Sequence, residues 1–172
     1  MRPFLRCLAF ILVSYSLAAH AHLMVAQRGT LKFGKGGYFF VVSIPISALT
    51  GIDDDGDGLL SAHELRDHRN RIEKAVSADF KLTSDKYGPR PIEGLLLNMA
   101  HNHGSLQKPS THIVAMGRFA VSKEEQKLRL ETTLFGKTIA EQKLVFKVSR
   151  GAQQEHLELS KQKNSRVLFS TL

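Results

Sequence analysis

Short apolar runs recur along most of this sequence, and residues that favour turns separate them. The clearest run is 127–134, in which Leu128, Leu130, Thr132 and Leu134 alternate with charged or polar residues. Alternation at every second residue predicts a strand with one face in the core and the other in water. Residues 37–44 are apolar on both faces and end at Pro45, which predicts a buried central strand.

Further strands are predicted at residues 23–33, 92–99, 113–121 and 144–148, with weaker ones at 157–159 and 167–169. The glycine-rich residues 34–37 predict a hairpin turn, and residues 135–137 predict another turn. Turns at this spacing favour a mainly β, antiparallel sandwich-like domain over a parallel α/β sheet.

The first 21 residues have the pattern of a signal peptide. Arg2 and Arg6 provide the positive start, residues 7–17 the short apolar stretch, and residues 19–21 (AHA) the cleavage site. We therefore expect an exported protein, periplasmic or secreted, whose residues 22–172 form a single β-rich domain without stable membrane insertion. Cleavage would remove Cys7, the only cysteine, so the mature domain would contain no disulfide.

One amphipathic helix is predicted from Ser61 to about Val76. Leu65, Ile72 and Val76 fall on one stripe at helical spacing. Ser61, followed three residues later by Glu64, forms a capping-box pattern that marks the start of the helix.

An acidic loop at residues 53–64 (DDDGDGLLSAHE) precedes and overlaps that helix. It matches the calcium-loop pattern D-x-[DN]-x-[DN]-G-x₅-E at every required position. Calcium takes six to eight oxygen ligands in a flexible shell, and alternate positions of a curled loop supply them. The pattern predicts calcium ligands from the following residues: Asp53, Asp55, Asp57, Leu59 (through its carbonyl), Ser61 and Glu64. Gly58 is predicted to make the sharp turn.

At these residues the sequence resembles the EF-hand family. The resemblance implies that Glu64 closes the metal shell with both carboxylate oxygens, and that the backbone of Leu60 pairs with a partner loop where one exists. The entering segment, residues 46–50, has room for a single helical turn, and there is no second hand. In this respect the loop is more similar to the calcium loops of extracellular modules such as dockerins. We therefore expect a calcium-binding structural or interaction module, with calcium as cofactor and an unknown protein partner.

As a whole the chain resembles small exported bacterial proteins with one EF-hand loop in a β-rich domain. It is more loosely similar to the exported front domains of nickel/cobalt permeases of the hydrogenase and urease accessory type. Residues 22–172 contain no apolar run long enough to span a bilayer, so a transport function is not predicted.

The histidines provide an alternative function. His22 would become the amino terminus after cleavage, His101 and His103 form an H-x-H pair, and His112 follows. Imidazoles suit copper and nickel, so the alternative is a periplasmic copper- or nickel-handling protein. A zinc-protease helix is excluded, because His63 and His68 are five residues apart rather than four.

The composition argues against two other classes of function. The chain has a formal net charge of +8, but its basic residues are scattered and lack interleaved aromatics, so nucleic-acid binding is not predicted. No nucleophile motif or phosphate-binding glycine loop is present, and an enzyme is not predicted. A hydrolase without a recognisable motif stays open as a third possibility.

Overall fold

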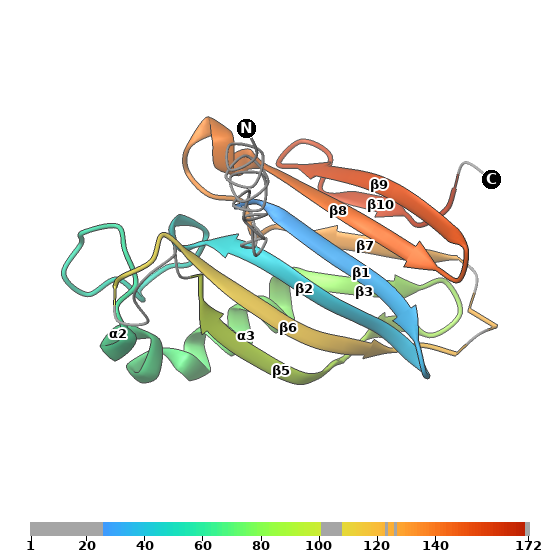
Figure 1. Cartoon of the computed structure of the whole chain (residues 1–172), viewed down its shortest axis with the longest axis horizontal. Coiled ribbons are helices and arrows are strands. Elements are labelled where there is room, and N and C mark those ends of the chain that lie inside the picture. Colours follow the sequence, from blue (N-terminus) through green and yellow to red (C-terminus); the bar gives the residue numbers. More distant parts are fainter. Residues whose placement is uncertain (1–25, 101–107, 123, 126, 171–172) are drawn as a thin grey trace, which may run out of the picture.

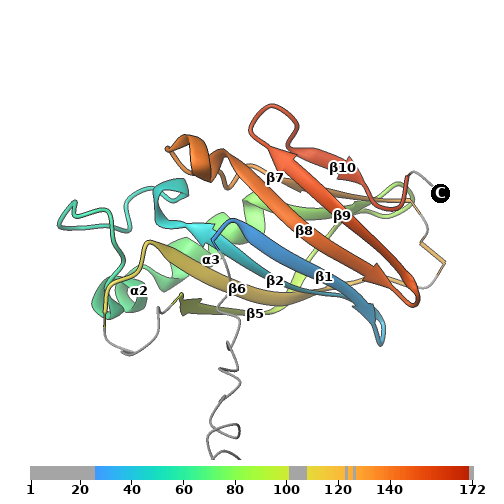
Figure 2. The ribbon, with the colours of Figure 1, turned by 45° about the horizontal axis from the view of Figure 1, so that its top comes forward.

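A computed structural model describes residues 26–100, 108–122, 124–125 and 127–170. Within these residues, ten strands form two sheets that pack face to face. Figure 1 looks onto the larger sheet. Figure 2 shows the smaller sheet and a helix, both behind the larger sheet. The prediction of a mainly β, sandwich-like and mostly antiparallel domain is confirmed.

The larger sheet has six strands in the order β5-β6-β2-β1-β8-β9, and the smaller has four in the order β10-β7-β3-β4. The strands have the following bounds: β1 Arg28–Gly34, β2 Gly37–Pro45, β3 Phe80–Ser84, β4 Gly88–Arg90, β5 Ile92–Met99, β6 His112–Ala120, β7 Leu128–Thr132, β8 Lys143–Arg150, β9 Gln153–Ser160 and β10 Ser165–Val167. The helical segments are η1 Ile46–Ala48, α2 Ala62–Asp67, α3 Arg69–Asp79 and η2 Ile139–Gln142.

β2 is a central strand of the larger sheet, as its continuous apolar pattern predicts. It pairs antiparallel with β1 on one side and with β6 on the other. The hairpin between β1 and β2 turns at Gly36, whose φ of 74° lies in the left-handed region that glycine adopts without strain. β1 also pairs with β8, and this pairing is parallel.

The core lies between the two sheets and is built around a cluster of aromatic rings. The ring of Phe80, from the smaller sheet, lies 4.9 Å from Phe40, 5.6 Å from Phe119 and 5.8 Å from Phe146, which all come from the larger sheet. All four side chains are at most 2% exposed. Aromatic pairs at these separations add to the stability that comes from burying apolar area.

The sequence analysis did not predict two strands of the smaller sheet. β3 begins directly after α3 and has only five residues, although Phe80 and Leu82 alternate with exposed positions in the expected way. β4 is Gly-Pro-Arg and lies at the sheet edge, where Pro89 is tolerated because its missing N–H faces no partner strand.

One expectation near the carboxyl terminus is wrong. The weak strand expected at residues 167–169 lies earlier, at β10, and ends at Val167. Residues 135–137, where a turn is predicted, lie in the connection from β7 of the smaller sheet to β8 of the larger. The connection crosses between the sheets and includes η2.

The predicted helix is present but is interrupted. α2 and α3 meet at His68, whose φ of −98° and ψ of 8° depart from helical values, and α3 continues past Val76 to Asp79. The predicted stripe is confirmed, since Ile72 and Val76 are fully buried and Leu65 packs against the core. The acidic loop lies between η1 and α2, at one end of the sandwich (Figure 1).

Candidate metal centre

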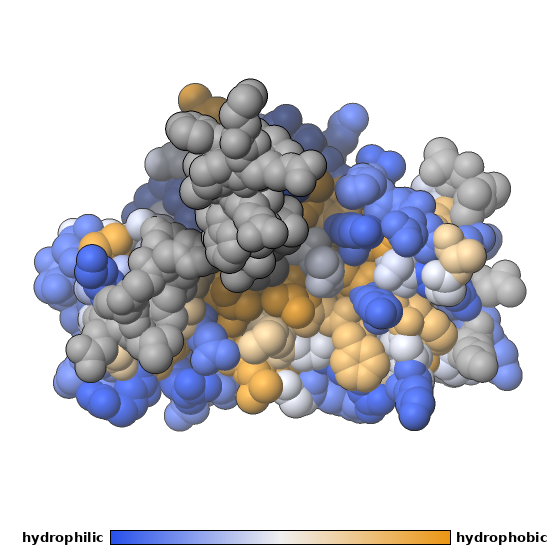
Figure 3. Space-filling view, in the orientation of Figure 1, coloured by the Kyte–Doolittle hydropathy of each residue, from blue (hydrophilic) through white to orange (hydrophobic). Residues whose placement is uncertain are grey.

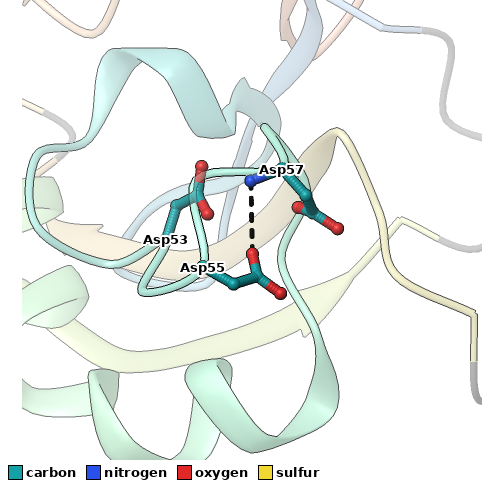
Figure 4. Close-up of side chains that lie close together, drawn as sticks. All are labelled: Asp53, Asp55 and Asp57. Atoms are coloured by element: carbon teal, nitrogen blue, oxygen red, sulfur yellow. Dashed lines mark hydrogen bonds between the residues drawn. The ribbon is translucent and has the colours of Figure 1, made fainter.

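Three aspartates of the acidic loop bring their carboxylates together. Asp53, Asp55 and Asp57 each offer an oxygen atom, and these atoms lie within 4.8 Å of one another (Figure 4). Asp53 is partly buried, and the other two side chains are exposed. Among the described residues no Lys, Arg or His lies within ion-pair distance of these three carboxylates. A hard cation is the partner that such a group of oxygens fits.

The loop's own backbone orients these side chains. The two carboxylate oxygens of Asp53 accept hydrogen bonds from the N–H groups of Gly56 (2.8 Å) and Gly58 (2.9 Å). The carboxylate of Asp57 accepts from the N–H of Leu59 at 2.7 Å, and that of Asp55 accepts from the N–H of Asp57 at 3.2 Å. The backbone of the loop therefore orients each of the three aspartates.

Two glycines give the loop its curl. Gly58 has a φ of 77°, which confirms the prediction that it makes the sharp turn. Gly56 has a φ of 75°, a second left-handed position that the sequence analysis did not single out. A Cβ at either position would meet no atom within 4 Å, so backbone conformation, and not crowding, favours glycine there.

Glu64 joins the two ends of the loop. One carboxylate oxygen accepts from the N–H of Asp54 at 2.8 Å, and the other accepts from the N–H and the hydroxyl of Ser61 at 2.8 and 2.7 Å. The side chain is 6% exposed. Hydrogen bonds from the backbone of Ser61 and Asp54 lower the pKa of this carboxyl and keep it ionised. Glu64 is not part of the close group of three aspartates.

Ser61 caps α2 as its sequence position predicts. Its hydroxyl oxygen accepts from the N–H of Glu64, and Glu64 bonds back to its N–H, which completes the capping box. Leu59, the expected carbonyl ligand, is partly buried and lies between Asp57 and the fully buried Leu60. The six expected ligand residues thus lie in one continuous segment, residues 53–64, in which Asp55 and Asp57 are exposed and Glu64 is buried.

Leu60 pairs with a segment far away in the sequence. Its N–H donates to the carbonyl of Ser110 at 2.8 Å, and the N–H of Ser110 donates back at 3.0 Å. Ser110 precedes β6, and its hydroxyl lies 2.7 Å from the carbonyl oxygen of Ala100, just after β5. The pairing expected with a partner loop is therefore made with the connection between β5 and β6.

Two side chains from the helical segment after the loop, His68 and Arg71, contact the amino-terminal end of the loop. The Nε2 atom of His68 lies 2.8 Å from a carboxylate oxygen of Asp54, the loop aspartate that the ligand pattern leaves out. Arg71 donates to the carbonyl of Gly51, just before the loop. The sequence analysis did not predict these contacts, because they depend on how the helices fold back toward the loop.

Of the four histidines predicted for the alternative metal site, the structure describes only His112. His22, His101 and His103 lie outside the described residues. His112 is half-buried, with Nε2 2.7 Å from the amide nitrogen of Gln27 and Nδ1 2.9 Å from the hydroxyl of Thr111. Both ring nitrogens of His112 therefore already have protein partners.

No protein-family model matches the chain, and no curated protein matches it. Within the described residues, no helix is long and apolar enough to cross a membrane. The functional argument therefore rests on the residues and geometry of the acidic loop.

Proposed function

We propose that this protein is an exported calcium-binding structural or interaction module, in which the acidic loop holds one Ca²⁺ in the manner of an EF-hand. The observation that carries the proposal is the group of three aspartate carboxylates within 4.8 Å of one another. The proposed ligands are the residues expected from the loop pattern: Asp53, Asp55, Asp57, Leu59 through its carbonyl, Ser61 and Glu64.

Electrostatic repulsion within the loop supports a bound cation. Asp53, Asp55 and Asp57 bring three negative charges close together, and no described cationic side chain pairs with them. At such separations like charges repel by about 1 kcal/mol in water and by more where water is excluded. A divalent cation converts this repulsion into attraction, so binding and folding of the loop stabilise each other.

The ligand chemistry favours calcium over other divalent metals. All the proposed ligand atoms are oxygens, which suit calcium and magnesium, whereas zinc and copper sites use imidazole or thiolate ligands. Magnesium requires a stricter octahedral shell and keeps several of its waters. A loop that offers a carbonyl, a hydroxyl and four carboxylates suits the larger, more flexible calcium shell.

The surroundings of the loop support a structural role over a signalling one. The segment before the loop, η1, has three residues, and α2 after it has six. Calcium sensors expose a groove by moving a pair of longer helices. Here Leu60, within the loop, is paired with Ser110, and the N–H of Ile46, in η1, donates to the carbonyl of Thr111 at 2.9 Å. The loop and the segment before it are therefore both bonded to the residues that precede β6.

Calcium titration by calorimetry tests the proposal. We expect one site per chain, with a dissociation constant of about 10⁻⁴–10⁻³ M, as in extracellular modules. Asp55→Asn and Glu64→Gln should each weaken binding strongly, since each removes a ligating charge.

Asp54→Asn is the matched control, because it removes one charge from the same loop at a position outside the ligand set. The Asp54 carboxylate bonds to His68 instead. Asp54→Asn should therefore change the calcium affinity much less than Asp55→Asn does. Equal losses of calcium affinity in the two variants would show that the loop attracts calcium only as a general acidic surface. Wild-type affinity in Glu64→Gln would show that Glu64 is not a ligand.

A further inference from the structure

The outer face of the six-stranded sheet has a distribution of side chains that the calcium proposal does not use. On strands β5, β6 and β2 the outward residues are mainly apolar, and on β1 and β8 they include several cations. Figure 3 looks onto this face and shows apolar atoms gathered beside hydrophilic ones. Monomeric proteins rarely leave a contiguous apolar patch open unless it has a binding role.

The apolar part is a shallow hollow between neighbouring strands. Phe39 is 47% exposed and Leu96 is 59% exposed, two of the most exposed large apolar side chains among the described residues. Between them lie Val41 and Met116, which stand opposite each other in the register of β2 and β6. These four residues line a cavity of about 570 Å³, whose walls are mostly apolar.

The basic part of this outer face lies on β1 and β8, one or two strands away from β2 and its apolar hollow. Lys32 stands opposite Phe39, and Lys147 stands opposite Thr30, which is the neighbour of Val41. Arg28 is on the same face of β1. All three are exposed, and among the described residues none has an ion pair. Strands are about 4.8 Å apart, so the cations lie within about 15 Å of the hollow.

The two carboxylates on this face are already neutralised. Glu93 bonds to the guanidinium of Arg118, and Glu158 lies 3.1 Å from the ammonium of Lys143. The face therefore carries a net positive charge from Arg28, Lys32 and Lys147. Its partner must combine negative charge with an apolar interior.

We propose that this face binds peripherally to the surface of an anionic phospholipid bilayer. Phe39 and Leu96 would enter between the headgroups, and the three cations would contact lipid phosphates. Peripheral binding grows with buried apolar area and with attraction to anionic lipid, and each basic residue near the surface contributes about fivefold in affinity. A second copy of the chain does not fit, because two such faces would oppose like charges.

Vesicle sedimentation tests the proposal, with the processed protein purified after export and its amino terminus measured by mass spectrometry. The vesicles contain either phosphatidylcholine alone or phosphatidylcholine with one-quarter phosphatidylglycerol. Chelator is present throughout, so that the result does not depend on the calcium site. We expect binding to the anionic vesicles only, and weaker binding as salt rises.

Paired variants show whether binding depends on the cations of this face or on the net charge of the whole molecule. Lys32→Glu with Lys147→Glu should reduce binding at least about tenfold. Lys81→Glu with Arg129→Glu makes the same charge change at exposed positions on the smaller sheet and should reduce it far less.

A second pair tests the apolar part. Phe39→Ser with Leu96→Ser should weaken binding, whereas Tyr87→Ser with Ile139→Ser, which alters two exposed apolar residues elsewhere, should not. Thermal melting confirms that each variant is folded. Failure of the native chain to bind anionic vesicles, or equal losses from test and control pairs, would overturn the proposal.

Discussion

At the scale of single residues, backbone hydrogen bonds orient the aspartates of the acidic loop. The carboxylate of Asp53 accepts two backbone hydrogen bonds, and that of Asp57 accepts one. These bonds already restrict the side chains, so a cation that bound here would cost little further side-chain entropy. The left-handed glycines make this arrangement possible, because they let successive N–H groups turn toward the aspartates.

The conformation of Gly58 leads to a prediction for Gly58→Ala. The added Cβ meets no neighbour, so the cost comes from the left-handed backbone alone, about 1–2 kcal/mol. We expect the free energy of unfolding to fall by that amount in urea denaturation. Gly58→Asn should lose less, because asparagine tolerates this conformation, and equal losses from both variants would contradict the conformational explanation.

His112 makes the stability of the fold depend on pH. Burial lowers the pKa of its ring below the ordinary value of about 6.5, and the nearby Glu141 carboxylate offsets only part of this effect. The unfolded chain therefore binds the proton more readily than the folded one. The stability contributed by neutral His112 is complete above about pH 6.5 and is lost as the pH falls below it.

Substitution of His112 tests this dependence. His112→Gln should flatten the decline in unfolding free energy between about pH 7 and 5. His156→Gln, which removes an exposed histidine from β9, is the control and should leave the decline as it is. A decline of unchanged steepness in His112→Gln would show that other groups cause it.

At the scale of elements, the acidic loop is coupled to the connection between β5 and β6. The pairing of Leu60 with Ser110 joins the loop to that connection, and the hydroxyl of Ser110 reaches the end of β5 at Ala100. The segment before β6 therefore holds the loop in shape through two reciprocal backbone hydrogen bonds.

Amide hydrogen exchange measures this coupling. If calcium stabilises the loop, it should slow exchange at the N–H of Ser110 as well as at that of Leu60, because the two groups bond to each other's carbonyls. The N–H of Leu157, on the distant edge strand β9, should respond only through global stability. Slower exchange at Leu60 with no change at Ser110 would show that the pairing opens independently of the metal.

At the scale of the whole molecule, calcium should raise stability. A ligand that binds only the folded chain adds about 2.7 kcal/mol at one hundred times its dissociation constant. The melting temperature should therefore rise with calcium and return to its starting value when chelator is added. An unchanged melting curve at saturating calcium would refute a structural role for the ion. Without calcium, we expect the aromatic core between the sheets to keep the chain folded.

Two strands of the smaller sheet, β3 and β4, and the interruption of the helix could not be predicted from the sequence. The residues of β4, Gly-Pro-Arg, do not favour a strand. They form one because they pair with the free edge of β3. The interruption at His68 coincides with its bond to Asp54, fourteen residues earlier. The local pattern describes a continuous helix, and only the folded chain brings that aspartate within reach.

Local features follow directly from the order of the residues: the strands that alternate, the cap at Ser61, and the aspartates whose spacing in one tight loop places them together. Spacing is sufficient there because a few residues of backbone fix the distances between neighbouring side chains. The tertiary structure alone decided which sheet each strand joins, that Leu60 pairs with Ser110, and that apolar and basic residues share one outer face. These outcomes depend on backbone hydrogen bonds between segments far apart in the chain, which leave no periodic signal in the sequence.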